Sequence, residues 1–225
     1  MKVDILMLAT HHIDEYTQYS IPIWKKYCEI HDYQFFNYQE KLIPDMAFTW
    51  SRIKMIQNHF QKSNADYIAM VDADTFLYKN KLDLSFSSLI EKYMIGEKKI
   101  LFQKDGSDRF GIYFSHNFKL SWELKRWVLP NAGFNIMKNC KEVHDFISTW
   151  LELGQGKLKH LATIHPMTQN VLTRGVLQDP EMNKLVGYLP SKIVSKRNTR
   201  FCKHLSAMSK SDIAKEIEKE YHKIF

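Results

Sequence analysis

Cysteine is scarce in this sequence, and the three residues that occur are not spaced for cross-links or for zinc. Cys28, Cys140 and Cys202 are odd in number and far apart, and no two of them form a Cys-x-x-Cys pair. Disulfide frameworks and zinc knuckles need paired or closely spaced cysteines. We therefore expect three buried, reduced thiols.

Long apolar runs and leader patterns are also missing. No stretch approaches the ~18 consecutive apolar residues of a membrane helix, and MKVDILMLATHH has neither the basic start nor the cleavage pattern of a signal peptide. Apolar residues still make up 44% of the 225 residues, which is ample for a folded core. Because no repeat or low-complexity linker occurs, we expect residues 1–225 to form one soluble domain in the cytoplasm.

Positive charge is concentrated at the C-terminal end. The net charge is +7, and residues 191–225 hold nine Lys/Arg against four Asp/Glu. Ile213, Ile217, Tyr221 and Ile224 recur there at helical spacing. A basic amphipathic helix of this kind either packs on its own domain, which is the commoner case, or lies on an anionic membrane surface. No zinc finger or long Lys/Arg cluster supports nucleic acid binding.

Strand-like and helix-like segments alternate along the chain. The expected strands cover residues 2–10, 33–39, 65–74 and 98–106, and the expected helices include residues 49–63, 82–93 and 140–154. Residues 129–139 read as a turn followed by a strand, and residues 107–128 as irregular. Two helices have apolar faces, formed by Ile23, Tyr27 and Ile30 and by Trp50, Ile53, Ile56 and Phe60. This order favours an α/β fold with a largely parallel sheet.

The stretch YIAMVDADTFLYKN, residues 67–80, ends a buried strand with two carboxylates. Ligands of α/β sheets bind at the C-terminal ends of the strands. Where the chain turns, Asp72 and Asp74 can reach one ion. Mg²⁺ and Mn²⁺ prefer oxygen ligands and leave coordination positions for phosphate oxygens. A strand-end aspartate also often caps a turn, so the pattern needs its context.

That context resembles the retaining GT-A glycosyltransferases of families 8 and 34. The motifs that carry the resemblance are YCEIHDYQFF, WSRIKM, VDADTFL, SWELKRWVLPNAGFNIMKNC and HLSAMSK, in that order between Leu6 and Lys210. The resemblance implies a GT-A fold, a Rossmann-like mixed and mostly parallel sheet flanked by helices. Residues 1–80 would form its nucleotide-binding half, residues 81–210 its donor-sugar and acceptor half, and residues 211–225 a basic C-terminal helix.

The resemblance also implies a metal site. Asp72, Asp74 and His204 would hold Mn²⁺ or Mg²⁺, which bridges the diphosphate of a UDP-sugar. His204, Ala207 and Lys210 match an H-x-x-G-x-x-K motif whose lysine contacts the diphosphate. Alanine replaces the motif's glycine and adds a Cβ where backbone approaches phosphate.

Further roles follow for donor-binding and catalytic residues. Arg52 would meet the diphosphate or the sugar hydroxyls, and Lys54 is the weaker candidate for that role. Thr10 would bind uracil and ribose, Ala73 the ribose, and Asn131, Ala132 and Gly133 the transferred sugar. Gln169, Asn131 and Arg52 are the expected catalytic residues. Thr168 stands where the family usually has an acid, and His165 is a nearby substitute.

The implied activity is metal-dependent transfer of a hexose or pentose, galactose or glucose being favoured, from a UDP-sugar to an oligosaccharide or lipid-linked glycan acceptor with retention of configuration. Bacterial surface polysaccharide or lipooligosaccharide synthesis is the expected setting. Acceptor choice is assigned to residues 107–128 and to the C-terminal part of the chain.

Three alternatives stay open. An inverting GT-A transferase would need a base, for which Asp105 and Asp108 are candidates. A catalytically silent sugar-nucleotide binding protein would fit Thr168 and Ala207. A nucleotidyltransferase usually has a Gly-rich phosphate loop near its N-terminus, and THHIDEYTQ contains none.

Overall fold

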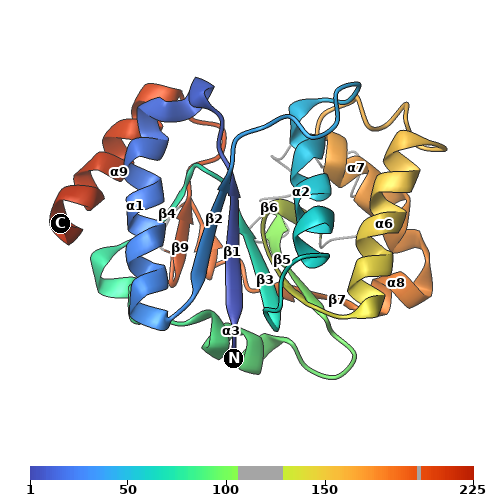
Figure 1. Cartoon of the computed structure of the whole chain (residues 1–225), viewed down its shortest axis with the longest axis horizontal. Coiled ribbons are helices and arrows are strands. Elements are labelled where there is room, and N and C mark those ends of the chain that lie inside the picture. The colour runs from blue at the N-terminus through green and yellow to red at the C-terminus, as the bar shows by residue number, and fades with distance from the viewer. Residues whose placement is uncertain (106–128, 197–198) are drawn as a thin grey trace.

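The computed structural model describes residues 1–105, 129–196 and 199–225. Its main sheet has the strand order β2-β1-β3-β6-β5-β7 (Figure 1). In chain order these strands are β1 (Val3–Leu8), β2 (Gln34–Tyr38), β3 (Tyr67–Val71), β5 (Ile100–Asp105), β6 (Leu129–Lys138) and β7 (Val186–Leu189). Within this sheet β6 pairs antiparallel with both neighbours, and the other pairs are parallel. The predicted α/β class with a mixed, mostly parallel sheet is confirmed.

A second, smaller sheet joins segments that are far apart in the sequence. It contains β4 (Thr75–Leu77), β9 (Cys202–His204) and β8 (Val194–Ser195), in that order. β4 is antiparallel to β9, with Thr75 opposite His204. The segment after Asp74 is therefore fixed beside a strand from the end of the chain.

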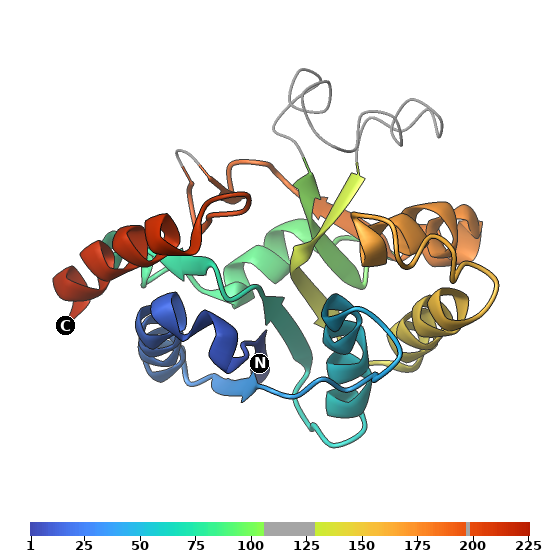
Figure 2. The same ribbon diagram turned by 90° about the horizontal axis from the view of Figure 1, so that it is seen from above.

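Helices cover both faces of the main sheet. One core is built with α1 (Asp14–His31), α3 (Phe86–Tyr93) and α9 (Lys210–Ile224), and the other with α2 (Ser51–Phe60), α6 (Lys141–Gln155), α7 (Met167–Arg174) and α8 (Pro180–Lys184). The connections contain the 3-10 helices η1 (His11–Ile13), η2 (Phe48–Trp50), η3 (Lys79–Lys81) and η4 (Val176–Gln178). Figures 1 and 2 both show α1 and α9 on one side, and α2, α6 and α7 on the other.

The strand before the two aspartates contributes to both cores. Ala69 and Val71 belong to the core under α1 and α9, whereas Ile68 and Met70 belong to the core under α2 and α6. Successive side chains of a strand point to opposite faces, and a sheet covered on both faces needs apolar residues on each. This double burial explains why the run up to Asp72 is unbroken.

The predicted apolar face of the 49–63 segment is confirmed. Its four residues line the core between α2 and α6, and none is more than 5% exposed: Trp50, Ile53, Ile56 and Phe60.

The predicted face of α1 is wrong at its last residue. Ile23 and Tyr27 are fully buried, but Ile30 is 44% exposed. The next residue, His31, covers the helix end instead, because its ring lies 4.5 Å from that of Tyr27 and its Nε2 lies 2.7 Å from the carbonyl oxygen of Leu82.

The turn predicted at the start of residues 129–139 is also wrong. β6 runs through this segment as one strand, but its register with β5 shifts: Phe102 pairs with Asn135 and Gln103 with Asn131. Residues 132–134 therefore bulge relative to β5 while β6 stays paired with β3. The turn-like sequence NAG therefore marks a bulge within the strand and does not interrupt it.

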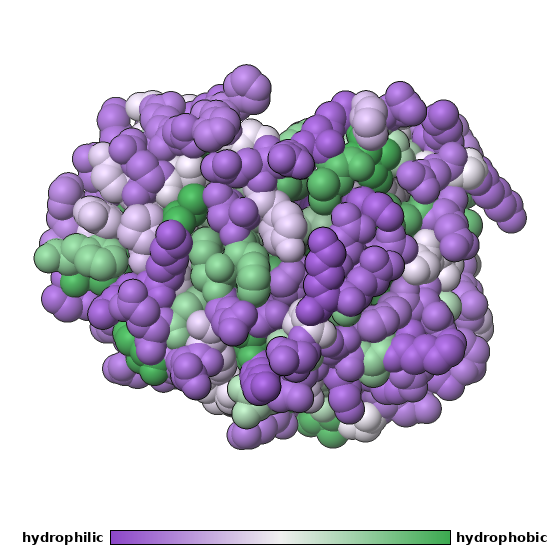
Figure 3. All heavy atoms as spheres, viewed as in Figure 1, coloured by the Kyte–Doolittle hydropathy of each residue, from purple (hydrophilic) through white to green (hydrophobic). Residues whose placement is uncertain are grey.

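The apolar face of α9 packs on its own domain, as the commoner alternative predicted. Ile213 is 6% exposed and Ile217 fully buried, both in the core with α1. The Tyr19 hydroxyl of α1 donates a hydrogen bond to Glu218 at 2.7 Å. On the side of the molecule seen in Figure 3, the surface is mainly hydrophilic, with small apolar patches. Within the described residues, no helix has both the length and the apolar character needed to cross a bilayer.

Gly154 in α6 allows close packing against Trp50, which leads to a stability prediction. A Cβ at Gly154 would lie 2.2 Å from the Trp50 ring, and that ring is held by a 3.0 Å hydrogen bond from Nε1 to the carbonyl oxygen of Ala162. We expect Gly154→Ala to lower the free energy of unfolding by about 1–3 kcal/mol. Urea denaturation measures the change.

Helix propensity alone predicts the opposite sign, a gain of roughly 1 kcal/mol for Gly→Ala. The exposed neighbour Gln155→Ala on the same helix is the control and should leave stability nearly unchanged. A stabilised Gly154→Ala protein would contradict the packing described here.

Candidate metal and donor site

A tight turn after β3 places both aspartates at one end of the sheet. The backbone N–H of Thr75 donates to the carbonyl oxygen of Asp72 at 3.0 Å, and the Thr75 hydroxyl donates to the same oxygen at 2.5 Å. The indole of Trp24 donates to the carbonyl oxygen of Thr75 at 3.0 Å from the buried face of α1. These backbone contacts fix the turn, so that the Asp72 and Asp74 side chains can share a ligand.

Strand β9 brings His204 to these carboxylates. Its Nε2 lies 3.4 Å from Oδ1 of Asp74 and 3.8 Å from Oδ2 of Asp72. One ligand atom from each of the three residues lies within 4.8 Å of the others. Neighbouring ligands of a six-coordinate Mg²⁺ or Mn²⁺ are separated by roughly 3 Å. Two carboxylates and an imidazole therefore fit a divalent cation with small movements.

Gln103 of β5, which was not among the predicted site residues, orients His204. The Nδ1 of His204 lies 3.0 Å from Oε1 of Gln103, whose Nε2 donates to the carbonyl oxygen of Val194 at 3.3 Å. Because the amide oxygen only accepts, Nδ1 donates its proton to Gln103, and Nε2 is the ring nitrogen that can bind a cation once its own proton has left. The one signal in the sequence was a polar residue at the end of the apolar run ILF.

Gly133 lets the metal-binding side chains come together. A Cβ there would lie 2.4 Å from Oδ2 of Asp72 and 2.7 Å from Cε1 of His204. The Gly133 carbonyl accepts a 2.8 Å bond from the N–H of Asp72, and its own N–H donates to Oδ1 of Asn131 at 2.7 Å. The NAG sequence is thus needed for close approach, not for a turn.

Arg52, in the first turn of α2, faces the same cluster. Its Nη1 lies 3.1 Å from Oδ1 of Asp72 and donates to the carbonyl oxygen of Ala132 at 3.2 Å. Lys54 differs, because its Nζ donates to the side chain of Gln57 at 2.8 Å. Arg52 is thus the cation of α2 that lies at the cluster, as the sequence favoured.

The three candidate ligands are electrostatically linked. Burial, opposed by the charge of Arg52, raises the pKa of Asp72 above its ordinary value. Burial alone would raise the pKa of Asp74 and lower that of His204, but their mutual attraction and hydrogen bond lower the pKa of Asp74 and raise that of His204. The cluster therefore favours positive charge at its centre, which a divalent cation supplies.

A cavity of about 290 Å³ opens over this cluster. Eight of the predicted site residues line it: Arg52, Asp72, Asp74, Asn131, Ala132, Gly133, Gln169 and His204. Thr49, Ser206, Ala207 and residues 165–168 complete the wall. Trp150 fixes the start of α7 beside the cavity, since its indole donates to the carbonyl oxygen of Thr168 at 2.9 Å.

Three predicted donor-binding residues lie outside this cavity wall. Thr10 precedes η1, and Ala73 is 7% exposed and belongs to the core under α1. The Nζ of Lys210 donates to the carbonyl oxygen of His12 at 2.7 Å. Their proposed contacts with nucleotide and diphosphate stay predictions.

The candidate bases of an inverting transferase also stay untested. Asp108 lies outside the described residues, as does the whole of the 107–128 segment that was assigned to acceptor choice. Asp105 ends β5, and its side chain is not among the described groups.

Ala207 occupies a backbone conformation that suits glycine. Its φ is 61°, and in the described part of the chain the other non-glycine residue with positive φ is Asp32, at 55°. The left-handed region costs an L-residue with a Cβ about 1 kcal/mol, and glycine nothing. The departure from the H-x-x-G-x-x-K pattern is therefore a local strain at the cavity wall.

Known proteins similar to this chain are glycosyltransferases. The sequence profile of the galactosyl transferase GMA12/MNN10 family matches residues 5–218. A curated relative, probable glycosyltransferase 6 of Oryza sativa subsp. indica, is 25% identical over 129 residues, which cover 57% of this chain. The matched region spans only 23% of that longer protein.

Solved structures share the fold. A glycosyltransferase involved in the glycosylation of the major capsid of PBCV-1 aligns over 97% of this chain and all of its own, with a TM-score of 0.74 and 13% identity. The galactosyltransferase LgtC, crystallised with donor and acceptor sugar analogs, aligns over 98% and 95%, with a TM-score of 0.60 and 12% identity. Mouse xyloside xylosyltransferase 1 aligns over 92% and 98%, with a TM-score of 0.54 and 11% identity. The predicted GT-A fold is confirmed.

Gln103 should control metal affinity through His204. We expect Gln103→Leu to weaken Mn²⁺ binding by about 10- to 100-fold, because the buried Nδ1–H loses its acceptor and the ring its orientation. Gln103→Glu keeps the acceptor for Nδ1–H but loses the donor to Val194, so its affinity should lie closer to that of the wild type than that of Gln103→Leu does. Calorimetric titration with Mn²⁺ alone measures both, and equal affinities for Gln103→Leu and wild type would show that this contact does not matter.

Ala207→Gly should stabilise the protein by about 0.5–1 kcal/mol, because glycine adopts the left-handed conformation without strain. Asp32→Gly, at the end of α1 and far from the cavity, is a matched control and should give a similar gain. Urea denaturation of both variants checks the prediction. A loss of stability in Ala207→Gly, as expected at an ordinary backbone position, would contradict it.

Proposed function

Since the chain belongs to the galactosyl transferase GMA12/MNN10 family, we propose that it transfers a sugar from a UDP-sugar to a glycan acceptor with retention of anomeric configuration. The sugar is a hexose or pentose, and galactose and glucose are the favoured candidates. The observation that carries the proposal is the convergence of Asp72, Asp74 and His204 in one cavity with Arg52. That set of groups suits a diphosphate bound through a divalent cation.

The chemistry requires that negative charge on the leaving diphosphate be stabilised. Mn²⁺ or Mg²⁺, when bound, supplies most of the positive charge that this needs. Arg52 adds a second positive charge on the α2 side of the cavity, aimed by its bonds to Asp72 and Ala132. Gln103 holds His204 in the tautomer that leaves Nε2 for the cation. Such preorganised charges act without reorganising during the reaction.

The remaining cavity wall is suited to the transferred sugar. Asn131 and Gln169 offer amide groups, and Gly133 leaves room for a sugar close to the backbone. Among the described residues of the wall, the carboxylates are Asp72 and Asp74, both assigned to the cation. A front-face path, in which the leaving phosphate takes the acceptor's proton, needs no further carboxylate and agrees with retention.

The acceptor and the biological setting are also proposals. We infer an oligosaccharide or lipid-linked acceptor, used on the cytoplasmic side in surface polysaccharide or lipooligosaccharide synthesis. The exposed lysines of α9 support contact with an anionic membrane surface, but its apolar face is used within the domain.

A silent sugar-nucleotide binding protein is the second candidate. It is favoured by Thr168, which lines the cavity and replaces the acid usual in the family, and by the strained Ala207. Such a protein would bind UDP and Mn²⁺ but leave the sugar in place.

Metal-dependent release of UDP separates the two candidates. We expect the wild-type protein to release UDP from at least one of UDP-galactose, UDP-glucose and UDP-xylose when Mn²⁺ is present, and not with excess EDTA. Asp74→Asn should reduce the rate by about 100-fold or more, because the neutral amide holds the cation poorly. Asp83→Asn, at an exposed aspartate, is the control and should keep full activity.

Two results would redirect the proposal. UDP binding without release from any donor would favour the silent protein. A product with inverted anomeric configuration by NMR would keep the transferase but replace retention with inversion.

A further inference from the structure

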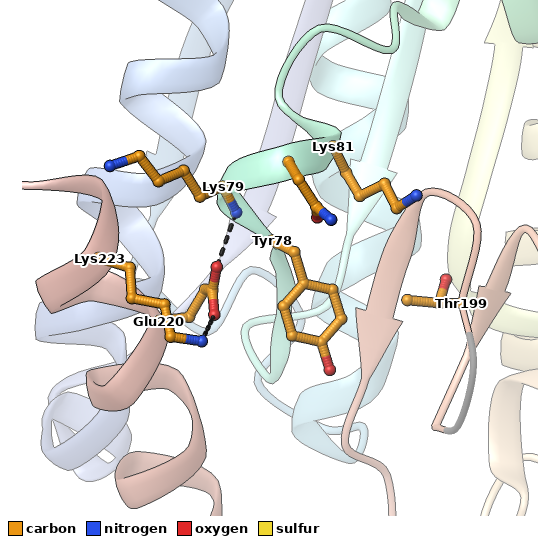
Figure 4. Close-up of a pocket in the computed structure, with 7 residues that line it drawn as sticks. Tyr78, Lys79, Lys81, Thr199, Glu220 and Lys223 are labelled. Carbon is orange, nitrogen blue, oxygen red and sulfur yellow. Dashed lines mark hydrogen bonds and ion pairs between the residues drawn. The ribbon is translucent and has the colours of Figure 1, made fainter.

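A second cavity lies between the end of β4, the segment near Thr199 and α9. Its volume is about 570 Å³, and it shares no lining residue with the donor cavity. Its lining includes Tyr78, Lys79, Lys81, Thr199, Glu220 and Lys223 (Figure 4). The function proposed above uses none of these residues.

Glu220 is buried at this cavity, and both of its carboxylate oxygens are bonded. Oε1 accepts from the backbone N–H of Lys79 at 2.7 Å, and Oε2 accepts from Nζ of Lys223 at 2.7 Å (Figure 4). The residue is only 3% exposed, and an unpaired charge there would cost several kcal/mol. Glu220 therefore fixes the start of η3, and Lys223 neutralises its charge.

Two ammonium groups are left for a ligand. No hydrogen bond or ion pair engages the Nζ atoms of Lys79 and Lys81 within the described part of the chain. Figure 4 shows their side chains extending away from each other, with the Lys81 ammonium group on the side of Thr199 and the Lys79 group on the opposite side. Because the charges do not converge, they suit a ligand with separated anionic groups better than one small anion.

The ring of Tyr78 lines the same cavity as the two lysines. Lys203 lies against this ring at 5.5 Å from its centroid, and its ammonium group is paired with Glu216 at 2.5 Å. Lys203 is thus already neutralised, and it holds the ring from the β9 side. Aromatic faces pack well against apolar groups, including the C–H face of a sugar ring.

We propose that this cavity is a second binding site, for a stretch of anionic oligosaccharide. One sugar ring packs on Tyr78, and carboxylate or phosphate groups on its neighbours reach Lys79 and Lys81. This site needs neither the nucleotide donor nor a metal ion, so it stands independently of the function proposed above.

Binding of a carboxylate-bearing oligosaccharide tests the site. The probe is a hexamer of galacturonic acid, titrated calorimetrically into the protein without UDP-sugar and with EDTA present. We expect the wild-type protein to bind it at least tenfold more tightly than maltohexaose, which is neutral. The double variant Lys79→Ser/Lys81→Ser should lose at least tenfold in affinity and keep the unfolding temperature of the wild type.

The matched control is Lys157→Ser/Lys159→Ser, which removes the same charge at the same spacing from exposed positions before α7. It should bind the hexamer as the wild type does. Equal losses in both double variants would reduce the effect to overall charge and overturn the proposal. The proposal would also be overturned if the wild type did not bind the hexamer or if maltohexaose bound equally well. The same holds if Lys79 and Lys81 bound phosphatidylglycerol vesicles and not the hexamer.

Discussion

The antiparallel pairing of β4 with β9 is the interaction on which the site depends. It sets Thr75 opposite His204, and the N–H of Leu205 donates to the carbonyl oxygen of Asp74 at 3.1 Å. Without this pairing the two carboxylates would face each other at the end of β3 with no imidazole between them. Bringing together two strands so far apart in the sequence costs conformational entropy. Burial of β4 and β9 in the core with α1 and α9 offsets this cost.

The antiparallel strand β6 supplies the second constraint. It returns beside β3 with its bulge at the level of Asp72, so that a backbone without a side chain meets the metal cluster at Gly133. A parallel strand at this place would end near the site, whereas β6 passes through it and continues into the sheet. The metal cluster is therefore held on or directly beside paired strands, which limits how far its groups can move.

The sequence located those parts of the fold and site that depend on local pattern. The doubly buried strand before Asp72 and the apolar face of α2 were visible in the spacing of residues. His204 was found only through resemblance, because nothing local joins it to a strand more than a hundred residues earlier. Gln103 was missed for the same reason: its partner is a residue of the small sheet, and a polar residue at a strand end has no distinctive spacing.

In the C-terminal helix α9, most acidic side chains face the domain whereas the lysines are exposed. Three of the four acids after residue 190 face the domain: Glu216 pairs with Lys203 beside His204, Glu218 bonds Tyr19 of α1, and Glu220 fixes Lys79. Because the acids are used inward, the outward face of α9 is more basic than its sequence implies. Glu216 contacts Lys203 in β9 and Glu220 contacts Lys79 just after β4, so α9 braces both strands of the pair that carries His204.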